Sequence, residues 1–176
     1  MKKYITSMAA LLISAAALAF AATQNWQIGA KYNITFSNAD VSGIFKTFKG
    51  AIAFDEKNLD ASKFDISIDV ASINTGNGLQ NQHAKSAEWF DAAKYPQIIF
   101  KSKKIVKSGA GYQVTGDLTI HGVTKEISFP FTFQNKGASG VFAGTFSVNR
   151  SDYHVGKAGE VAEVVKLSIS VPVDKK

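Results

Sequence analysis

Apolar and polar residues alternate along most of this chain, and this alternation constrains its fold more than any other feature. In the segment 26–36, the even-numbered residues are mostly aromatic or aliphatic, and polar or small residues stand between them. The same period of two returns in three later segments, 64–70, 142–148 and 165–173. A period of two that persists over seven or more residues is typical of strands with one apolar and one polar face.

Further strands are expected near 44–55, 97–106, 111–120 and 125–134, which gives about eight in all. Most connections are short and rich in turn residues, so neighbouring strands should be antiparallel. Three architectures are compatible with these strands: a sandwich, an outer-membrane barrel and a closed soluble barrel. Aromatic residues lie within the strands rather than in girdles at their ends, which favours the soluble barrel. We therefore expect an all-β fold, an antiparallel eight-stranded closed barrel, in which Pro130 marks an edge, a bulge or a corner.

One segment, 75–96, breaks the alternation. It predicts a short helix with Ser86 at its N-cap, ended by Pro96. Trp89 and Phe90 would lie on this helix and cover one end of the barrel.

The first residues have the pattern of a secretory signal. Two lysines precede a short apolar run, and the small residues Ala19 and Ala21 match a signal-peptidase site. The run is short for a membrane span, which disfavours an uncleaved anchor. We expect a signal peptide at 1–21, one domain at 22–176, and export to a bacterial periplasm.

Composition excludes several kinds of site. The chain contains no cysteine, so disulfides, thiolate metal sites and lipid attachment to a thiol are excluded. Its net charge of +6 includes the two lysines of the signal, and the other lysines are scattered among acids except at 101–104. Because nucleic-acid binders concentrate their positive charge, no nucleic-acid partner is expected. Mild basicity suits a solvated exterior, and it would also suit contact with an anionic membrane surface.

The histidines do not indicate catalysis. His83, His121 and His154 share no ligand-like spacing, and no hydrolase or metalloprotease motif occurs. His121 and Gly122 stand between two strand patterns, where a tight hairpin needs a glycine. We therefore expect no catalytic residue and no metal.

Four segments resemble a known family. They are VSGIFKTFKGAIAFDE (41–56), ASINTGNGLQNQHAKSAEWFDAAKYPQIIFKS (71–102), GDLTIHGVTKEISFPFTF (116–133) and FSVNRSDYHVG (146–156). They occur in family order, the similarity extends over nearly the whole mature chain, and their joint occurrence is a specific signal. The chain thus resembles the YceI-like family of polyisoprenoid-binding, lipocalin-like periplasmic proteins.

The resemblance implies a lipocalin-like barrel that sequesters, stores or carries a long-chain apolar lipid, either a polyisoprenoid or an isoprenoid quinone. It implies no enzymatic activity and no cofactor apart from the bound lipid. A fatty acid or fatty amide is an alternative ligand. An enzyme that acts on a lipid or quinone at the barrel mouth is the alternative of another class, and it would require groups such as His83 and Asp91 to lie together. Transient membrane contact and a homodimer are also left open.

The apolar strand faces supply the candidate site, with a completely filled core as the competing interpretation. The predicted cavity residues are Tyr32, Ile34, Phe36, Phe45, Phe48, Phe64, Ile66, Ile68, Trp89, Phe90, Phe100, Phe129, Phe131, Phe142 and Phe146. Contacts to a lipid head group are predicted for His83, Arg150 and His154. The planar guanidinium of Arg150 suits a phosphate or carboxylate, although a salt bridge to Asp152 or another acid is the competing interpretation.

Overall fold

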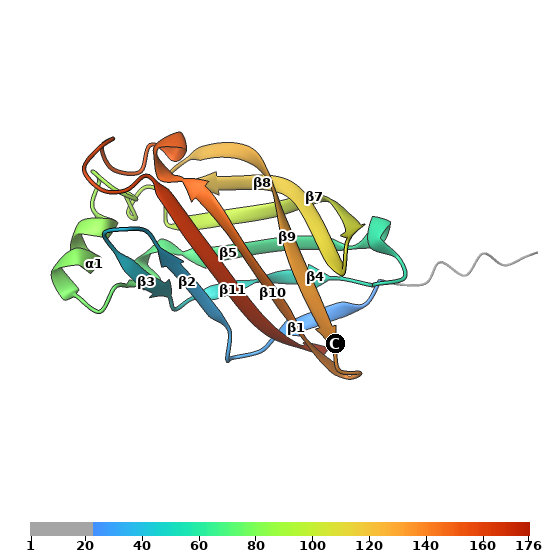
Figure 1. The fold of residues 1–176 in the computed structure, drawn as a ribbon. Helices are drawn as coiled ribbons and strands as arrows, with labels where there is room; N and C mark the ends of the chain where they lie inside the picture. Colours follow the sequence, from blue (N-terminus) through green and yellow to red (C-terminus); the bar gives the residue numbers. More distant parts are fainter. Residues whose placement is uncertain (1–22) are drawn as a thin grey trace, which may run out of the picture.

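The alternating segments form strands that pair antiparallel with their neighbours (Figure 1). The computed structural model describes residues 23–176, so the predicted signal peptide and its cleavage after Ala21 lie outside the described residues. The elements are β1 (Asn25–Ile28), β2 (Asn33–Ser37), β3 (Ser42–Phe45), β4 (Phe48–Ala53), η1 (Leu59–Ala61), β5 (Lys63–Asp69), η2 (Val70–Ser72), β6 (Ile73–Asn74), α1 (Gly78–Lys85), β7 (Gln97–Ser108), β8 (Gly111–Ile120), β9 (Val123–Asn135), β10 (Ser139–Asn149), η3 (Arg150–Tyr153) and β11 (Val164–Lys175).

The sheet closes into a barrel because its first and last strands pair. The order around the barrel is β1, β4, β5, β7, β8, β9, β10 and β11, and β1 then pairs with β11, with Trp26 opposite Lys175. The short strands β2, β3 and β6 continue the wall beyond β1, β4 and β5. The closed eight-stranded antiparallel barrel with one α-helix confirms the predicted fold class.

The wall is interrupted at two places where the sequence predicts continuous strands. A turn separates β1 from β2, and Lys46 and Thr47 separate β3 from β4. The hydroxyl of Tyr32 bridges the second interruption, because it donates to the backbone oxygen of Lys46 (2.8 Å) and accepts from the backbone N–H of Phe48 (3.1 Å). Tyr32 therefore stabilises the barrel wall where β3 ends and β4 begins.

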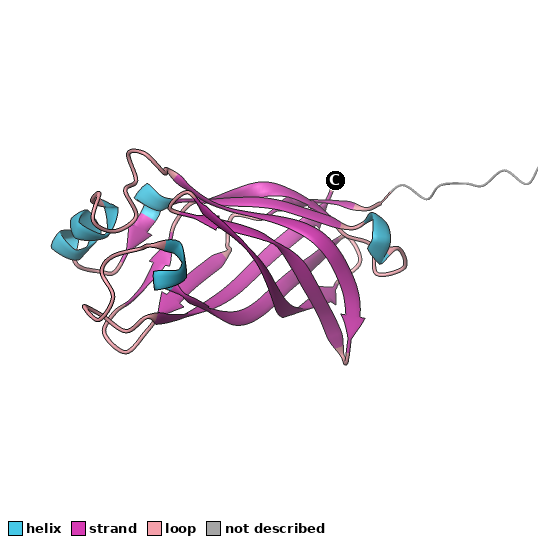
Figure 2. Cartoon of the chain, turned by 90° about the horizontal axis from the view of Figure 1, so that it is seen from above, coloured by secondary structure: helices cyan, strands magenta, loops and turns pink. Residues whose placement is uncertain are grey.

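The apolar strand faces point into the barrel. On β9, the buried Phe129 and Phe131 alternate with the exposed Ser128, Pro130 and Thr132. Outer-membrane barrels carry their apolar band on the outside, so this alternation decides against that alternative. Figure 2 shows the strands around one interior, with the helical segments at the ends of the barrel.

Pro130 marks the point where β9 and β10 separate. The ladder between these strands ends at the pair Phe131–Gly144, because proline has no N–H to continue it. Beyond this point η3 is tied to β9 by an ion pair between Lys125 and Asp152 (3.2 Å). Pro130 thus creates a local edge in the middle of the wall.

Aromatic rings fill the half of the barrel that lies away from α1. Phe54, which is only 1% exposed, lies at the centre of this group, with five ring centroids between 5.1 and 6.1 Å from its own. The indole N–H of Trp26 donates to the backbone oxygen of Phe54 (2.9 Å). We call this group the aromatic core; it consists of Trp26, Phe54, Phe64, Tyr112, Phe131, Phe133 and Phe142. Such ring pairs each contribute about 0.5–1.5 kcal/mol beyond their buried area.

Tyr112 gives the aromatic core a measurable response to alkaline pH. Burial, together with a hydrogen bond from its hydroxyl to Glu56 (2.8 Å), raises the pKa of Tyr112 to about 12. The unfolded chain releases this proton near pH 10, so the folded state loses stability as the pH rises from about 10 to about 12. Denaturant unfolding across this range should show a smaller loss for Tyr112→Phe than for the wild type. Equal losses would contradict the assignment.

Helix α1 begins and ends earlier than predicted. Asn77 is its N-cap, and the side-chain oxygen accepts from two backbone N–H groups of the first turn (2.9 and 3.1 Å). Ser86 instead lies at the C-terminal end of the helix, so its predicted N-cap role is wrong. Trp89 and Phe90 lie in the turns that follow α1. Within residues 23–176, no helix combines the length and the hydropathy needed to cross a membrane.

Candidate binding cavity

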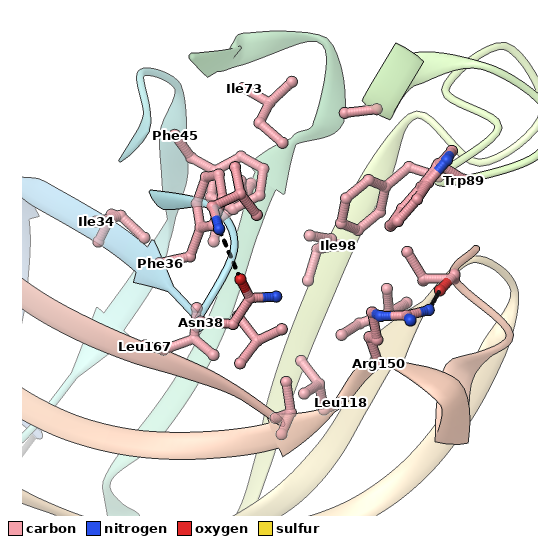
Figure 3. Close-up of a pocket in the computed structure, with 18 of the residues that line it drawn as sticks. Ile34, Phe36, Asn38, Phe45, Ile73, Trp89, Ile98, Leu118, Arg150 and Leu167 are labelled. Atoms are coloured by element: carbon pink, nitrogen blue, oxygen red, sulfur yellow. Dashed lines mark hydrogen bonds between the residues drawn. The ribbon is translucent and has the colours of Figure 1, made fainter. Parts of the chain in front are cut away.

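The half of the barrel next to α1 is hollow (Figure 3). Its cavity has a volume of about 760 Å³ and is lined mainly by aliphatic and aromatic side chains from the strands. Small-molecule sites usually enclose about 300–1,000 Å³ with a few polar groups among apolar walls. The hollow half therefore has the size and chemistry of a site for one apolar molecule.

The structure brings most of the predicted cavity residues together around this space. Those that line it are Ile34, Phe36, Phe45, Phe48, Ile66, Ile68, Trp89, Phe90, Phe100, Phe129 and Phe146. Four others do not line it: Tyr32 bridges the wall, and Phe64, Phe131 and Phe142 belong to the aromatic core. These three rings share the inward parity of the lining residues, but they lie deeper along their strands.

The prediction missed many of the aliphatic side chains in the wall. They include Ile73, Ile98, Leu118, Ile120, Ile127, Val148, Val165, Leu167 and Ile169. The strand alternation already placed Leu167 and Ile169 on an apolar face, so parity alone could have found them. The prediction favoured aromatic residues instead.

Three phenylalanines lie where the cavity meets the aromatic core. The ring centroids of Phe100 and Phe129 are 5.2 Å apart, and Phe146 stacks on Phe129 at 4.2 Å. Gly116 leaves room for the Phe100 ring, since a Cβ there would lie 2.8 Å from its Cζ atom. The next inward residue after Phe129 on β9 is Phe131, which belongs to the aromatic core. We call Phe100, Phe129 and Phe146 the cavity floor.

The mouth of the cavity lies at α1 and the turns after it. Trp89 donates from its indole N–H to Nε2 of His83 (2.6 Å), and both residues line the cavity. Glu88 pairs with Lys157 (2.7 Å), which joins these turns to the loop 155–162. The hydrogen bond from Lys157 favours the carboxylate form of Glu88 and lowers its pKa. The predicted position of Trp89 and Phe90 at one end of the barrel agrees with this arrangement, although they are not helical.

Arg150 lines the cavity, but four of its five N–H donors are engaged by the protein. It is 5% exposed, and its guanidinium donates to the backbone oxygens of four residues of the loop 155–162 at 2.6 to 3.4 Å. It also lies against Trp89, with 5.3 Å between its Cζ atom and the ring centroid (Figure 3). Asp152, the acid expected beside it, pairs with Lys125 instead. The main role of Arg150 is therefore to hold the loop over the mouth.

This role predicts a clear effect of Arg150→Lys. An ammonium group cannot reach four carbonyls in different directions or stack on the indole. We expect a loss of about 2–3 kcal/mol in the free energy of unfolding, equivalent to one or two charge-assisted hydrogen bonds. Faster hydrogen exchange across 155–162 should accompany it, whereas Lys166→Arg at an exposed site should change neither. Unchanged exchange in the loop would contradict the role.

The other two histidines lie away from the cavity. His154 is exposed in a left-handed conformation (φ 57°) at the end of η3, so its predicted head-group role has no support from its position. His121 and Gly122 form the turn between β8 and β9, where the His121 ring packs edge-on against Tyr95 (4.8 Å). In the described part of the chain, no three His, Cys, Asp or Glu residues come together as metal ligands would.

Comparison with known proteins places this chain among relatives of one family. The sequence profile described as a YceI-like domain matches residues 21–173. A UPF0312 protein of Vibrio parahaemolyticus is 36% identical over 131 residues, which are 70% of this chain and 69% of the relative. Matches to two further relatives span 52% and 45% of their lengths.

Solved structures show the same barrel. Burkholderia cenocepacia BcnA has a TM-score of 0.78 and 30% identity, over 83% of this chain and 99% of that chain. A domain from Saccharophagus degradans, described as polyisoprenoid binding, has a TM-score of 0.67 and covers 89% of this chain and 100% of that chain. Its identity is 16%, so this second likeness concerns the fold.

Proposed function

The chain belongs to the YceI-like family, and on this premise we propose that it binds one long-chain apolar lipid inside the hollow half of its barrel. The observation that carries the proposal is the cavity of about 760 Å³ with walls of aliphatic and aromatic side chains. An apolar chain in this space would make contacts with the apolar lining and would remove that lining from water.

Burial of the chain supplies the free energy of binding. Each methylene removed from water contributes about 0.8 kcal/mol, so a dozen contribute on the order of 10 kcal/mol before the costs of ordering the chain. Binding then requires no bond chemistry. The enzyme alternative needs a catalytic pair such as His83 and Asp91, but Nε2 of His83 accepts from Trp89, and Asp91 does not line the cavity.

A neutral isoprenoid, such as a polyisoprenoid or an isoprenoid quinone, suits the mouth better than a fatty acid. A carboxylate would need a free cationic partner, and four of the five N–H donors of Arg150 are engaged by backbone carbonyls. The description of the Saccharophagus degradans domain as polyisoprenoid binding supports the same ligand class.

Organic extraction of the purified protein, followed by mass spectrometry, tests this proposal. We expect one isoprenoid lipid in near-stoichiometric amount. A fatty acid in its place would contradict the isoprenoid assignment, and lipid-free protein that also fails to take up prenyl alcohols would contradict lipid binding altogether.

We propose further that the protein is exported to the periplasm and carries or stores its lipid there. The support is the positively charged start, the short apolar run and the small residues before position 22. N-terminal sequencing of periplasmic protein should begin near residue 22. A sequence that begins at Met1 would contradict export by a cleaved signal.

A further inference from the structure

We infer that the cavity floor sets the length of lipid chain that the protein can enclose; this inference rests on the proposed function. The floor rings Phe100 and Phe129 are about 5% exposed, and the floor closes the hollow half on the side away from the mouth. A chain that enters past Trp89 and His83 therefore reaches a wall of rings before it has crossed the barrel.

The barrier behind the floor is deep. The centroids of Phe64, Phe131 and Phe142 lie 5.4 to 6.2 Å from one another, and Phe54 packs against all three. On the far side, Trp26 and Phe54 of this core meet an open surface depression that is also lined by charged residues. The aromatic core thus fills the barrel interior between the cavity and this surface. A chain could cross only by displacing several packed rings.

The volume above the floor gives the expected length. At about 30 Å³ for each water-sized group, 760 Å³ holds on the order of 25 carbon groups, or about five isoprene units. A longer chain must leave its remaining units in water at the mouth. The protein should therefore discriminate between isoprenoids by length.

Capture of prenyl alcohols from lipid vesicles tests this discrimination by chain length. Phosphatidylcholine vesicles that contain an equimolar series of prenyl alcohols, each one isoprene unit longer than the last, are incubated with lipid-free protein. The protein is then separated from the vesicles and its lipid is identified by mass spectrometry. Units that move from bilayer to cavity stay in apolar surroundings, so the captured amounts should be similar up to about five units. Beyond that length each extra unit enters water, and capture should fall about tenfold or more per unit.

Two variants should move this limit in opposite directions. Phe146→Ala removes a floor ring and should extend the limit by about one isoprene unit, since the lost ring has about the volume of that unit. Ile169→Trp adds a ring at the last lining position of β11 before Val171 and should shorten the limit. Thermal melts verify that both variants are folded, and the wild-type series stands as a test without them.

The outcomes separate the two proposals. If the wild-type protein captures no prenyl alcohol of any length, the proposed lipid-binding function fails and this inference fails with it. If capture stays constant up to the longest alcohol, lipid binding stands but the floor does not limit length. If the limit is present but neither folded variant shifts it, the floor is not its cause.

Discussion

Leu167→Asp is expected to weaken lipid binding about a hundredfold or more while the barrel stays folded. Leu167 lines the cavity from β11, so a carboxylate there would face the bound chain. In the lipid-free protein water can solvate this carboxylate within the hollow, but the lipid displaces that water. Loss of its solvation costs several kcal/mol, and each 1.4 kcal/mol corresponds to about tenfold in affinity. Competition between the lipid and a fluorescent apolar probe measures the effect.

The next residue supplies the control. Ser168 is exposed on the outside of the same strand, so Ser168→Asp adds the same charge without reaching the cavity. Its affinity should remain within about twofold of the wild type, because exposed substitutions usually change energies by less than 0.5 kcal/mol. Equal losses in the two variants would show that charge, and not position in the cavity, controls binding.

Phe131→Ala is expected to destabilise the domain by about 3–5 kcal/mol, the usual cost of removing a packed phenylalanine. Phe131 is 4% exposed. Its ring stacks on Tyr112, with 5.3 Å between the ring centroids, and packs edge-on against Phe54, with 5.7 Å between the centroids. On sequence alone this residue is expected to line the cavity, where its loss would mainly reduce affinity. Its place in the aromatic core reverses that expectation. Denaturant unfolding gives the free energy, and the melting temperature should fall on the order of 10 °C.

Two companion variants locate the effect. Thr132→Ala changes the adjacent, exposed residue of β9 and should cost less than about 1 kcal/mol. Leu167→Ala truncates a side chain that faces open space, so it should cost less than the same change in a packed core. If Phe131→Ala left stability unchanged, the aromatic core would not be the packed region described above.

The barrel could be predicted from the sequence because the alternation along each strand fixes which side chains face the interior. Once one face of a strand is apolar, every second residue must go to the same side. The strands 142–148 and 165–173 accordingly lie within β10 and β11, and their apolar residues point inward. Most of the residues predicted to line the cavity do line it, but many aliphatic lining residues were missed, and parity could not distinguish lining from filling.

The boundary between the hollow and filled halves was not predictable from one strand at a time. Phe129 and Phe131 have the same residue type, parity and strand, yet one lines the cavity and the other is packed. The difference comes from their partners, because Val114 lies opposite Phe129 and the larger Tyr112 lies opposite Phe131. Register across the barrel decides which rings meet, and no local pattern contains it.

The role of Arg150 and the position of α1 could not be predicted from the sequence, because both depend on contacts between segments. The four carbonyls around Arg150 converge only after the loop 155–162 has folded back over the mouth. The actual cap, Asn77, is an ordinary N-cap residue before Gly78. Ser86 matched the cap pattern equally well, so the choice depended on contacts that the segment alone does not reveal.

The division of the interior into a packed half and an empty half has an evolutionary consequence. Substitutions around the packed rings would be removed by selection because they threaten folding. Substitutions in the empty half would change stability little, and they would alter the shape that a guest molecule meets. One ancestral barrel could therefore acquire new cargoes by drift in a few wall positions, while its aromatic core stayed intact. Such a scaffold would also be a practical starting point for engineered carriers of other hydrophobic compounds.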